Sequence, residues 1–154
     1  MKRVNLIDLL PTINETLDKG ETFSFMPNGI SMLPTIVGGR DAVTIKKPDS
    51  KLKKYDIILY RRKSGQFVLH RIVGVENNSY ILCGDNEARK EKNIPHECVI
   101  GVVTKYNQNG KCVNSGSKKF YRDAKKRVYT RPIRHIFLGI KNKMFCPIFG
   151  LEKK

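Results

Sequence analysis

The stretch that decides the fold is residues 56–75, DIILYRRKSGQFVLHRIVGV. Two runs rich in β-branched and aromatic residues, 56–61 and 66–75, flank a short polar turn at 63–65. Apolar runs of this length on both sides of a glycine-containing turn predict a β-hairpin. The chain is therefore expected to contain at least one antiparallel strand pair.

Shorter runs of the same kind continue on both sides of the hairpin, each bounded by turn residues. They predict strands at 22–26, 42–45, 79–83 and 99–105. Many short strands with frequent turns are typical of a mainly β domain. A length of 154 residues suits one domain with an ordinary core.

Helical periodicity flanks the strands. Leucine and isoleucine recur at helical spacing over residues 5–19, and Gly20 follows where a helix would end. Residues 120–143 mix aromatic and aliphatic side chains with Lys and Arg, and Pro132 and Pro147 are expected to break this region into one or two short basic amphipathic helices. The expected organisation is an N-terminal helix, a β domain and a basic, partly helical tail, at residues 1–20, 21–105 and 106–154.

Positive charge is concentrated in the last third of the chain. The sequence holds 30 Lys+Arg and 14 Asp+Glu, and residues 105–154 contain 14 of the basic and 2 of the acidic residues. Such a tail favours an anionic partner, either a membrane surface or nucleic acid. Because the cations alternate with aromatic and aliphatic side chains, we expect peripheral contact with an anionic membrane rather than nucleic-acid binding. A solvated basic face that only aids solubility is the alternative.

The sequence predicts no membrane span, cofactor or metal site. The apolar run near the start is broken by Asp8 and Pro11, which makes a poor secretory signal. No window approaches the ~18 apolar residues of a transmembrane helix. The four cysteines form no CxxC pair and no cluster with histidine at metal-binding spacing, so free thiols in a reducing compartment are expected. We expect a cytoplasmic protein or one peripheral at the membrane.

The sequence GISMLPT, residues 29–35, places a serine, Ser31, between a glycine and a proline. A serine hydroxyl becomes a nucleophile only when a neighbouring base accepts its proton. His70 is the best candidate, because strand alternation places it in an apolar row that favours a neutral imidazole. Asp85, after the strand at 79–83, can either reach the imidazole or fix the loop that carries Asn86. On spacing alone, His70 can equally be a core residue and Ser31 the cap of a turn.

Taken together, these segments resemble the signal peptidase I and LexA-like superfamily of serine peptidases. The Ser-Met-x-Pro-Thr box, the downstream His-Arg-Ile and the Gly-Asp-Asn are a specific combination, and the resemblance covers about residues 20–105. The matching segments are GISMLPTI (29–36), GRDAVTI (39–45), YDIILYRR (55–62), VLHRIVGV (68–75), YILCGDN (80–86) and VIGVV (99–103).

The resemblance implies a role for each matching residue. Ser31 would be the nucleophile and Met32 would stand beside the substrate cleft. Most bacterial members use a lysine base, whereas this sequence has His70, as in the endoplasmic-reticulum, archaeal and sporulation-type subgroup. In that subgroup an aspartate near the glycine-rich box assists, which points to Asp85. The implied fold is a small, mostly β, partly open barrel.

Two features depart from the pattern. Many signal peptidases have a serine two positions before the nucleophile to help hold the oxyanion, and Gly29 stands there instead. The oxyanion would then depend on backbone N–H groups, with that of Ser31 the obvious donor. Signal peptidases also carry transmembrane anchors, and none is predicted in this chain.

The sequence therefore predicts a serine endopeptidase (a hydrolase) of signal-peptidase type that processes signal or leader segments of membrane-proximal polypeptides, with catalytic residues Ser31, His70 and Asp85. An inactive peptidase-fold module that binds an anionic membrane or nucleic acid is the alternative. Autoproteolysis within a regulator is a second one, which the short segment before the β domain disfavours.

Overall fold

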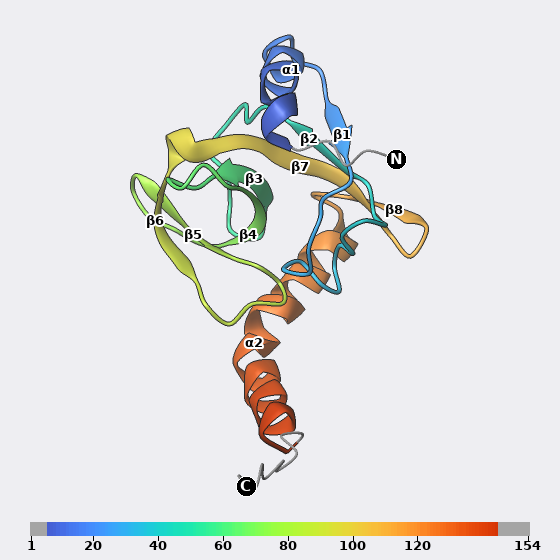
Figure 1. Cartoon of the computed structure of the whole chain (residues 1–154), viewed down its shortest axis with the longest axis vertical. Coiled ribbons are helices and arrows are strands. Elements are labelled where there is room, and N and C mark those ends of the chain that lie inside the picture. Colours follow the sequence, from blue (N-terminus) through green and yellow to red (C-terminus); the bar gives the residue numbers. More distant parts are fainter. Residues whose placement is uncertain (1–5, 145–154) are drawn as a thin grey trace, which may run out of the picture.

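The hairpin predicted at residues 56–75 lies in the middle of the sheet. It consists of β3 (Ile57–Arg61) and β4 (Phe67–Val75), which pair antiparallel. Figure 1 shows the fold as a computed structural model that describes residues 6–144, in which β3 lies between β7 and β4. The prediction of a hairpin is confirmed.

Six further strands complete an eight-stranded antiparallel sheet in the described part of the chain. They are β1 (Phe23–Phe25), β2 (Val43–Lys46), β5 (Ser79–Cys83), β6 (Glu91–Pro95), β7 (Val99–Gln108) and β8 (Lys111–Asn114). The order is β1-β2-β7-β3-β4-β5-β6, with β8 paired to β7, and within residues 6–144 no pairing joins β1 to β6. In Figure 1, β7 runs across the top and β3 to β6 curl beneath it. The mainly β class is confirmed, and the sheet is open.

Both faces of the central hairpin are buried. One face joins a hydrophobic cluster that includes Leu59, Leu69, Ile13 of the first helix and Phe120 of the second. The other face joins a second cluster, which includes Tyr60, Val68, Ile72, Tyr80 and Leu82. His70 is fully buried on this second face, between its neighbours Val68 and Ile72, as strand alternation predicts.

The helix α1 (Leu6–Asp18) covers one end of the sheet. Its buried residues Ile13 and Leu17 are four apart and so share one face of the helix, whereas Pro11 is exposed. Gly20 follows with φ +77°, and its N–H donates to the carbonyl of Leu17 at 3.1 Å. A glycine after the last turn ends the helix at little steric cost, and the predicted N-terminal helix is confirmed.

The helix α2 (Lys118–Met144) is continuous, and the predicted break at Pro132 is wrong. A proline inside a helix removes one backbone hydrogen bond and crowds the preceding turn, and here the helix continues through it. Pro147 lies outside the described residues. The first turns of α2 pack on the core through Phe120 and Ala124, and the rest projects away from the sheet (Figure 1).

The boundary expected at residue 105 falls inside the fold. Strand β7 runs on to Gln108, β8 pairs back onto it, and Tyr106 packs with Phe120 in the first cluster. Neither α1 nor the described part of α2 combines the length and hydropathy that a membrane crossing requires.

Candidate active site

Local turns shape the Ser31 segment, which follows β1. The N–H of Ile36 donates to the carbonyl of Met32 at 3.0 Å, which closes a helical turn directly after Ser31. Gly29 has φ +93°, a conformation that residues with a side chain rarely adopt. Nothing lies within 4 Å of the position where a Cβ of Gly29 would stand, so the backbone conformation rather than crowding requires a glycine here.

The loop between β5 and β6 packs against this segment. The N–H of Asn86 donates to the carbonyl of Ser31 at 2.8 Å. A Cβ at Gly84 would lie 2.6 Å from the same carbonyl oxygen, closer than Cβ atoms normally approach. The Gly-Asp-Asn segment and the Ser-Met box, 50 residues apart in sequence, are therefore direct neighbours, and Gly84 allows their contact.

His70 is fully buried in β4, yet one of its ring nitrogens lacks a hydrogen-bond partner within the described part of the chain. Its Nδ1 lies 3.2 Å from the Tyr60 hydroxyl. Its Nε2 makes no hydrogen bond among the described residues. Burial favours the neutral ring and lowers the pKa of His70, despite the opposing charges of Glu87 and Glu91. A neutral imidazole with a free nitrogen is the form that can accept a proton.

Two carboxylates approach the imidazole, one at each nitrogen. Glu87 Oε2 lies 3.5 Å from Nε2, and Glu91 Oε1 lies 3.4 Å from Nδ1. Both glutamate side chains are partly exposed, at 38% and 22%, whereas the ring is not. Either negative charge would stabilise the imidazolium that forms when His70 takes up a proton.

Arg62 holds Glu91 in place beside the ring. Its Nε donates to Oε2 of Glu91 at 3.0 Å, and its Nη2 makes a shorter contact with Oε1. Burial acts to raise the pKa of Glu91, but the hydrogen bonds from Arg62 and Tyr60 outweigh it and lower that pKa. Glu91 is thus an ionised carboxylate beside Nδ1, the ring nitrogen that also faces the Tyr60 hydroxyl.

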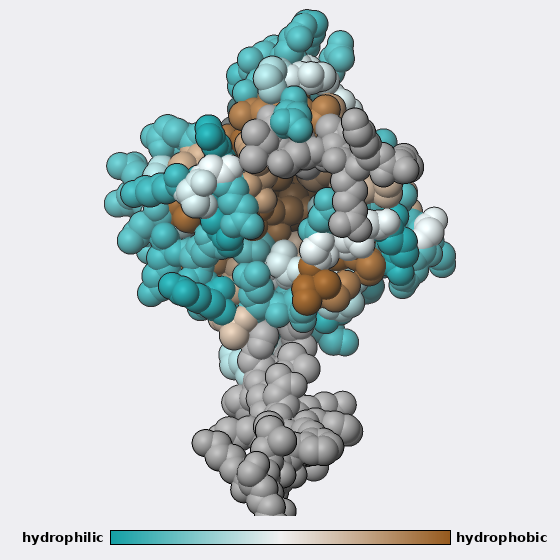
Figure 2. Space-filling model, in the orientation of Figure 1, coloured by the Kyte–Doolittle hydropathy of each residue, from teal (hydrophilic) through white to brown (hydrophobic). Residues whose placement is uncertain are grey.

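A cavity of about 700 Å3 brings Ser31 and His70 to one site. Gly29 and Met32 line the same cavity, and apolar side chains from β3, β4 and the Ser31 segment form much of its wall. Figure 2 shows a hollow lined with hydrophobic surface near the centre of this face of the molecule. No hydrogen bond joins Ser31 to His70 in the part of the chain that the structure describes. Such contacts often tighten only when substrate binds.

Asp85, which we expected to support the imidazole, instead forms hydrogen bonds with Arg71 and Thr35. Its carboxylate accepts two hydrogen bonds from Arg71, at 2.8 and 2.7 Å, and a shorter one from the Thr35 hydroxyl. Burial opposes ionisation, but the charge and hydrogen bonds of Arg71 outweigh it and lower the pKa of Asp85. Asp85 therefore ties the Ser-Met box to β4, in line with the loop-fixing alternative.

The carboxylates that do contact His70 have only a faint signal in the sequence. Glu87 follows Asp85 by two residues in the loop after β5, where it is half-buried. Glu91 begins β6, a polar strand without apolar alternation that the sequence does not predict, and it pairs with Leu82 of β5. Only the pairing of β5 with β6 brings Glu91 to the imidazole.

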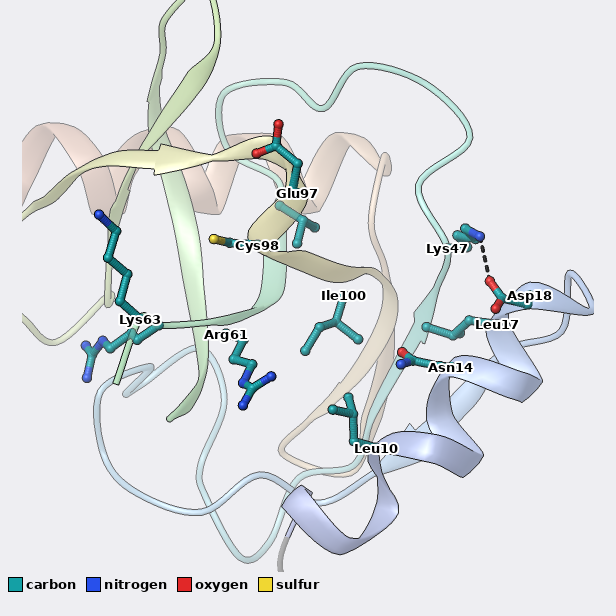
Figure 3. Close-up of a pocket in the computed structure, with 12 residues that line it drawn as sticks. Leu10, Asn14, Leu17, Asp18, Lys47, Arg61, Lys63, Glu97, Cys98 and Ile100 are labelled. Atoms are coloured by element: carbon teal, nitrogen blue, oxygen red, sulfur yellow. Dashed lines mark hydrogen bonds and ion pairs between the residues drawn. The ribbon is translucent and has the colours of Figure 1, made fainter. Parts of the chain in front are cut away.

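A second cavity, of about 710 Å3, lies beside α1 (Figure 3). Leu10 and Leu17 contribute apolar surface, and Arg61 and Lys63 contribute positive charge. Neither Ser31 nor His70 lines it. Arg62, which is ion-paired with Glu91, lines both cavities.

No protein-family model matches the chain, and neither does any curated protein sequence.

Proposed function

We propose that this protein is a serine endopeptidase of signal-peptidase type, with Ser31 as nucleophile and His70 as general base. The observation that carries the proposal is that these two residues line one cavity, and that the buried imidazole has no hydrogen-bond partner at Nε2 among the described residues. The resemblance of the Ser-Met box and the Gly-Asp-Asn loop supports it, because these segments are also in contact.

The reaction would follow the usual course for a serine peptidase. Ser31 Oγ attacks the scissile carbonyl while His70 takes its proton, and the imidazolium then protonates the leaving amine. Water hydrolyses the resulting acyl-enzyme with the same histidine as base. The backbone N–H of Ser31 is the proposed oxyanion donor, since Gly29 has no side chain to contribute.

In this proposal, Glu91 takes the role that the resemblance implies for Asp85. Proton uptake at Nε2 requires the other ring nitrogen, Nδ1, to carry a proton, and Glu91 lies 3.4 Å from Nδ1. A carboxylate at this place fixes the tautomer and stabilises the imidazolium. Asp85 contributes indirectly, by fixing the segment that carries the nucleophile.

The proposed substrates are extended polypeptide segments such as leaders or signal peptides. Apolar side chains line part of the cavity, among them Phe25 of β1, a strand that pairs only with β2 among the described residues. An extended peptide could add to such an edge through main-chain hydrogen bonds. As part of the same proposal, the sheet is a partly open barrel of the signal-peptidase and LexA-like kind. The curled antiparallel sheet supports this assignment.

We also propose that α2 contacts an anionic membrane surface. Its described part carries exposed Tyr129 and Ile133 together with Lys125 and Lys126. Each basic residue near an anionic leaflet contributes roughly 1 kcal/mol. Such contact would hold the cavity close to membrane-proximal substrates.

The alternative function is an inactive binding module with the same fold. The missing hydrogen bond between Ser31 and His70 in the described structure favours it. Incubation with a peptide library, followed by mass-spectrometric mapping of the cuts, separates the two. If the protein is a peptidase, the wild type should cleave at defined bonds and Ser31→Ala should not cleave. An absence of cleavage by both proteins would support the binding module.

A further inference from the structure

Three potential metal ligands converge beside the cavity. One ligand atom from each of His70, Glu87 and Glu91 lies within 4.8 Å of the other two. They come from β4, from the loop after β5 and from β6, so no sequence spacing links them. The imidazole is 1% exposed, and its Nε2 lacks a hydrogen-bond partner among the described residues. A buried ring nitrogen left unpaired beside carboxylates is an unfilled coordination position.

The donor set indicates which ions would fit. One imidazole nitrogen and two carboxylate oxygens are ligands that Zn²⁺ and related transition-metal ions accept, with water in a fourth position. Mg²⁺ and Ca²⁺ prefer oxygen ligands and gain little from an imidazole. Bonds of about 2.0–2.1 Å place tetrahedral ligands roughly 3.3 Å apart. Glu87 already lies 3.5 Å from Nε2, whereas Glu91 lies 3.4 Å from Nδ1, so Glu91 would have to turn toward Nε2 for the three side chains to share one ion.

The local charge also suits a cation that enters from solvent. His70 and Glu87 both line the 700 Å3 cavity, from which an ion would have to reach the buried Nε2. Glu87 and Glu91 carry two negative charges, and the guanidinium of Arg62 offsets one of them. To bind a metal, Glu91 would have to release one oxygen from Arg62.

We propose that His70, Glu87 and Glu91 form a reversible binding site for a divalent transition-metal ion, represented by Zn²⁺, and that the bound ion inhibits the peptidase. Inhibition follows because Nε2 cannot both coordinate the ion and accept the proton of Ser31. The inhibitory part rests on the proposed function, whereas metal binding does not.

Binding is measured by isothermal titration with ZnCl₂, in a Cys98→Ser, Cys112→Ser, Cys146→Ser background that removes competing thiols. We expect one ion per chain. Glu87→Gln and Glu91→Gln should each weaken binding by at least about tenfold, a loss that is reached even when a residue that only hydrogen-bonds to a metal ligand is replaced. Arg62→Gln should strengthen it several-fold, because it frees Glu91 and removes a positive charge. A loss of structure would not strengthen binding.

The matched control is Glu97→Gln, an exposed glutamate outside this site, which should bind as the parent does. MgCl₂ should give no comparable binding. Equal Zn²⁺ affinity in the parent, Glu87→Gln and Glu91→Gln would overturn the site, as would no binding at all.

Inhibition is measured as labelling of Ser31 by a fluorophosphonate probe at increasing Zn²⁺. Labelling should fall with a midpoint at the measured dissociation constant, and labelling that persists at saturation would overturn the inhibitory role. If Ser31 is never labelled but Zn²⁺ binds as described, the peptidase proposal fails while the metal site stands.

Discussion

Asp85 and Glu91 are predicted to have different roles, Asp85 in the stability of the fold and Glu91 in catalysis. Replacing each by its neutral amide distinguishes the two roles. Asp85→Asn removes the charge opposite Arg71 while it keeps the shape of the side chain. Both partners of this ion pair are essentially inaccessible, at 0% and 1% exposure. Loss of one partner leaves the other charge buried without compensation, which costs roughly 3–5 kcal/mol of unfolding free energy.

For a chain of this length, each kcal/mol shifts Tm by about 2–4 °C, so Asp85→Asn should lower Tm by roughly 6–20 °C. Glu91→Gln should cost on the order of 1 kcal/mol or less, because its partner Arg62 is 31% exposed and the pair is partly hydrated. For peptidase activity, Glu91→Gln rather than Asp85→Asn should have the larger effect. Glu91→Gln should lose roughly 10²–10⁴-fold in kcat/KM, because the imidazole loses its orienting carboxylate.

The assay combines urea unfolding with kcat/KM, both measured at a temperature where every variant is folded. Asp49→Asn, on an exposed side chain, is the matched control and should change stability by less than about 0.5 kcal/mol. Arg71→Met combined with Asp85→Asn should recover part of the stability lost in Asp85→Asn alone, because no charge is then buried unpaired. A normally stable Asp85→Asn with abolished activity would refute the reasoning.

Four further outcomes are expected. His70→Ala should lose roughly 10²–10⁴-fold in peptidase activity whereas His96→Ala should lose little, and the reverse order in the same assay would contradict the assignment of the base. The pH midpoint of the acid limb of the kcat/KM profile should lie below the ordinary histidine pKa of ~6.5, because burial lowers the pKa of His70 and the base acts when deprotonated. Glu91→Gln should lower this midpoint further, because it removes a negative charge beside the ring. A midpoint above the ordinary value would contradict the assignment of His70 as the base. Gly84→Ala should destabilise the protein and reduce activity, because its Cβ would lie 2.6 Å from the Ser31 carbonyl, whereas Gly110→Ala, with nothing within 4 Å, tests backbone strain alone. The protein should co-sediment with anionic vesicles at low salt and less so at high salt; no vesicle binding with strong DNA binding in a gel-shift assay would contradict the membrane proposal.

The central strands could be predicted because their signal is local. The apolar runs of β3 and β4 and the glycine-containing turn between them suffice to predict a hairpin. Strand β6 carries no such signal, since Glu91, Lys92 and Asn93 begin it and the strand forms by pairing with β5. Strand β8 has only four residues, although Asn109-Gly110 before it is a hairpin signal that sequence reading could have used.

The same contrast between local signals and long-range contacts applies to the candidate site. Ser31 and His70 could be proposed from residue type and pattern, and they line one cavity. The carboxylate that lies beside the imidazole could not be predicted, because its identity depends on where the buried Arg71 points. Arg71 lies next to His70 but on the opposite face of β4, and it donates two hydrogen bonds to Asp85. Glu91 then reaches the imidazole from a strand that no local pattern predicts.

The central claim, that Ser31 is a nucleophile activated by His70, is tested most directly by labelling with a fluorophosphonate probe and locating the adduct by mass spectrometry. The account predicts one adduct, on Ser31, in the wild type. The adduct should be strongly reduced in His70→Ala and unchanged in the control Ser64→Ala, an exposed serine of the β3–β4 turn. Labelling that is absent from Ser31 in the folded wild-type protein, or equally fast without His70, would contradict the account.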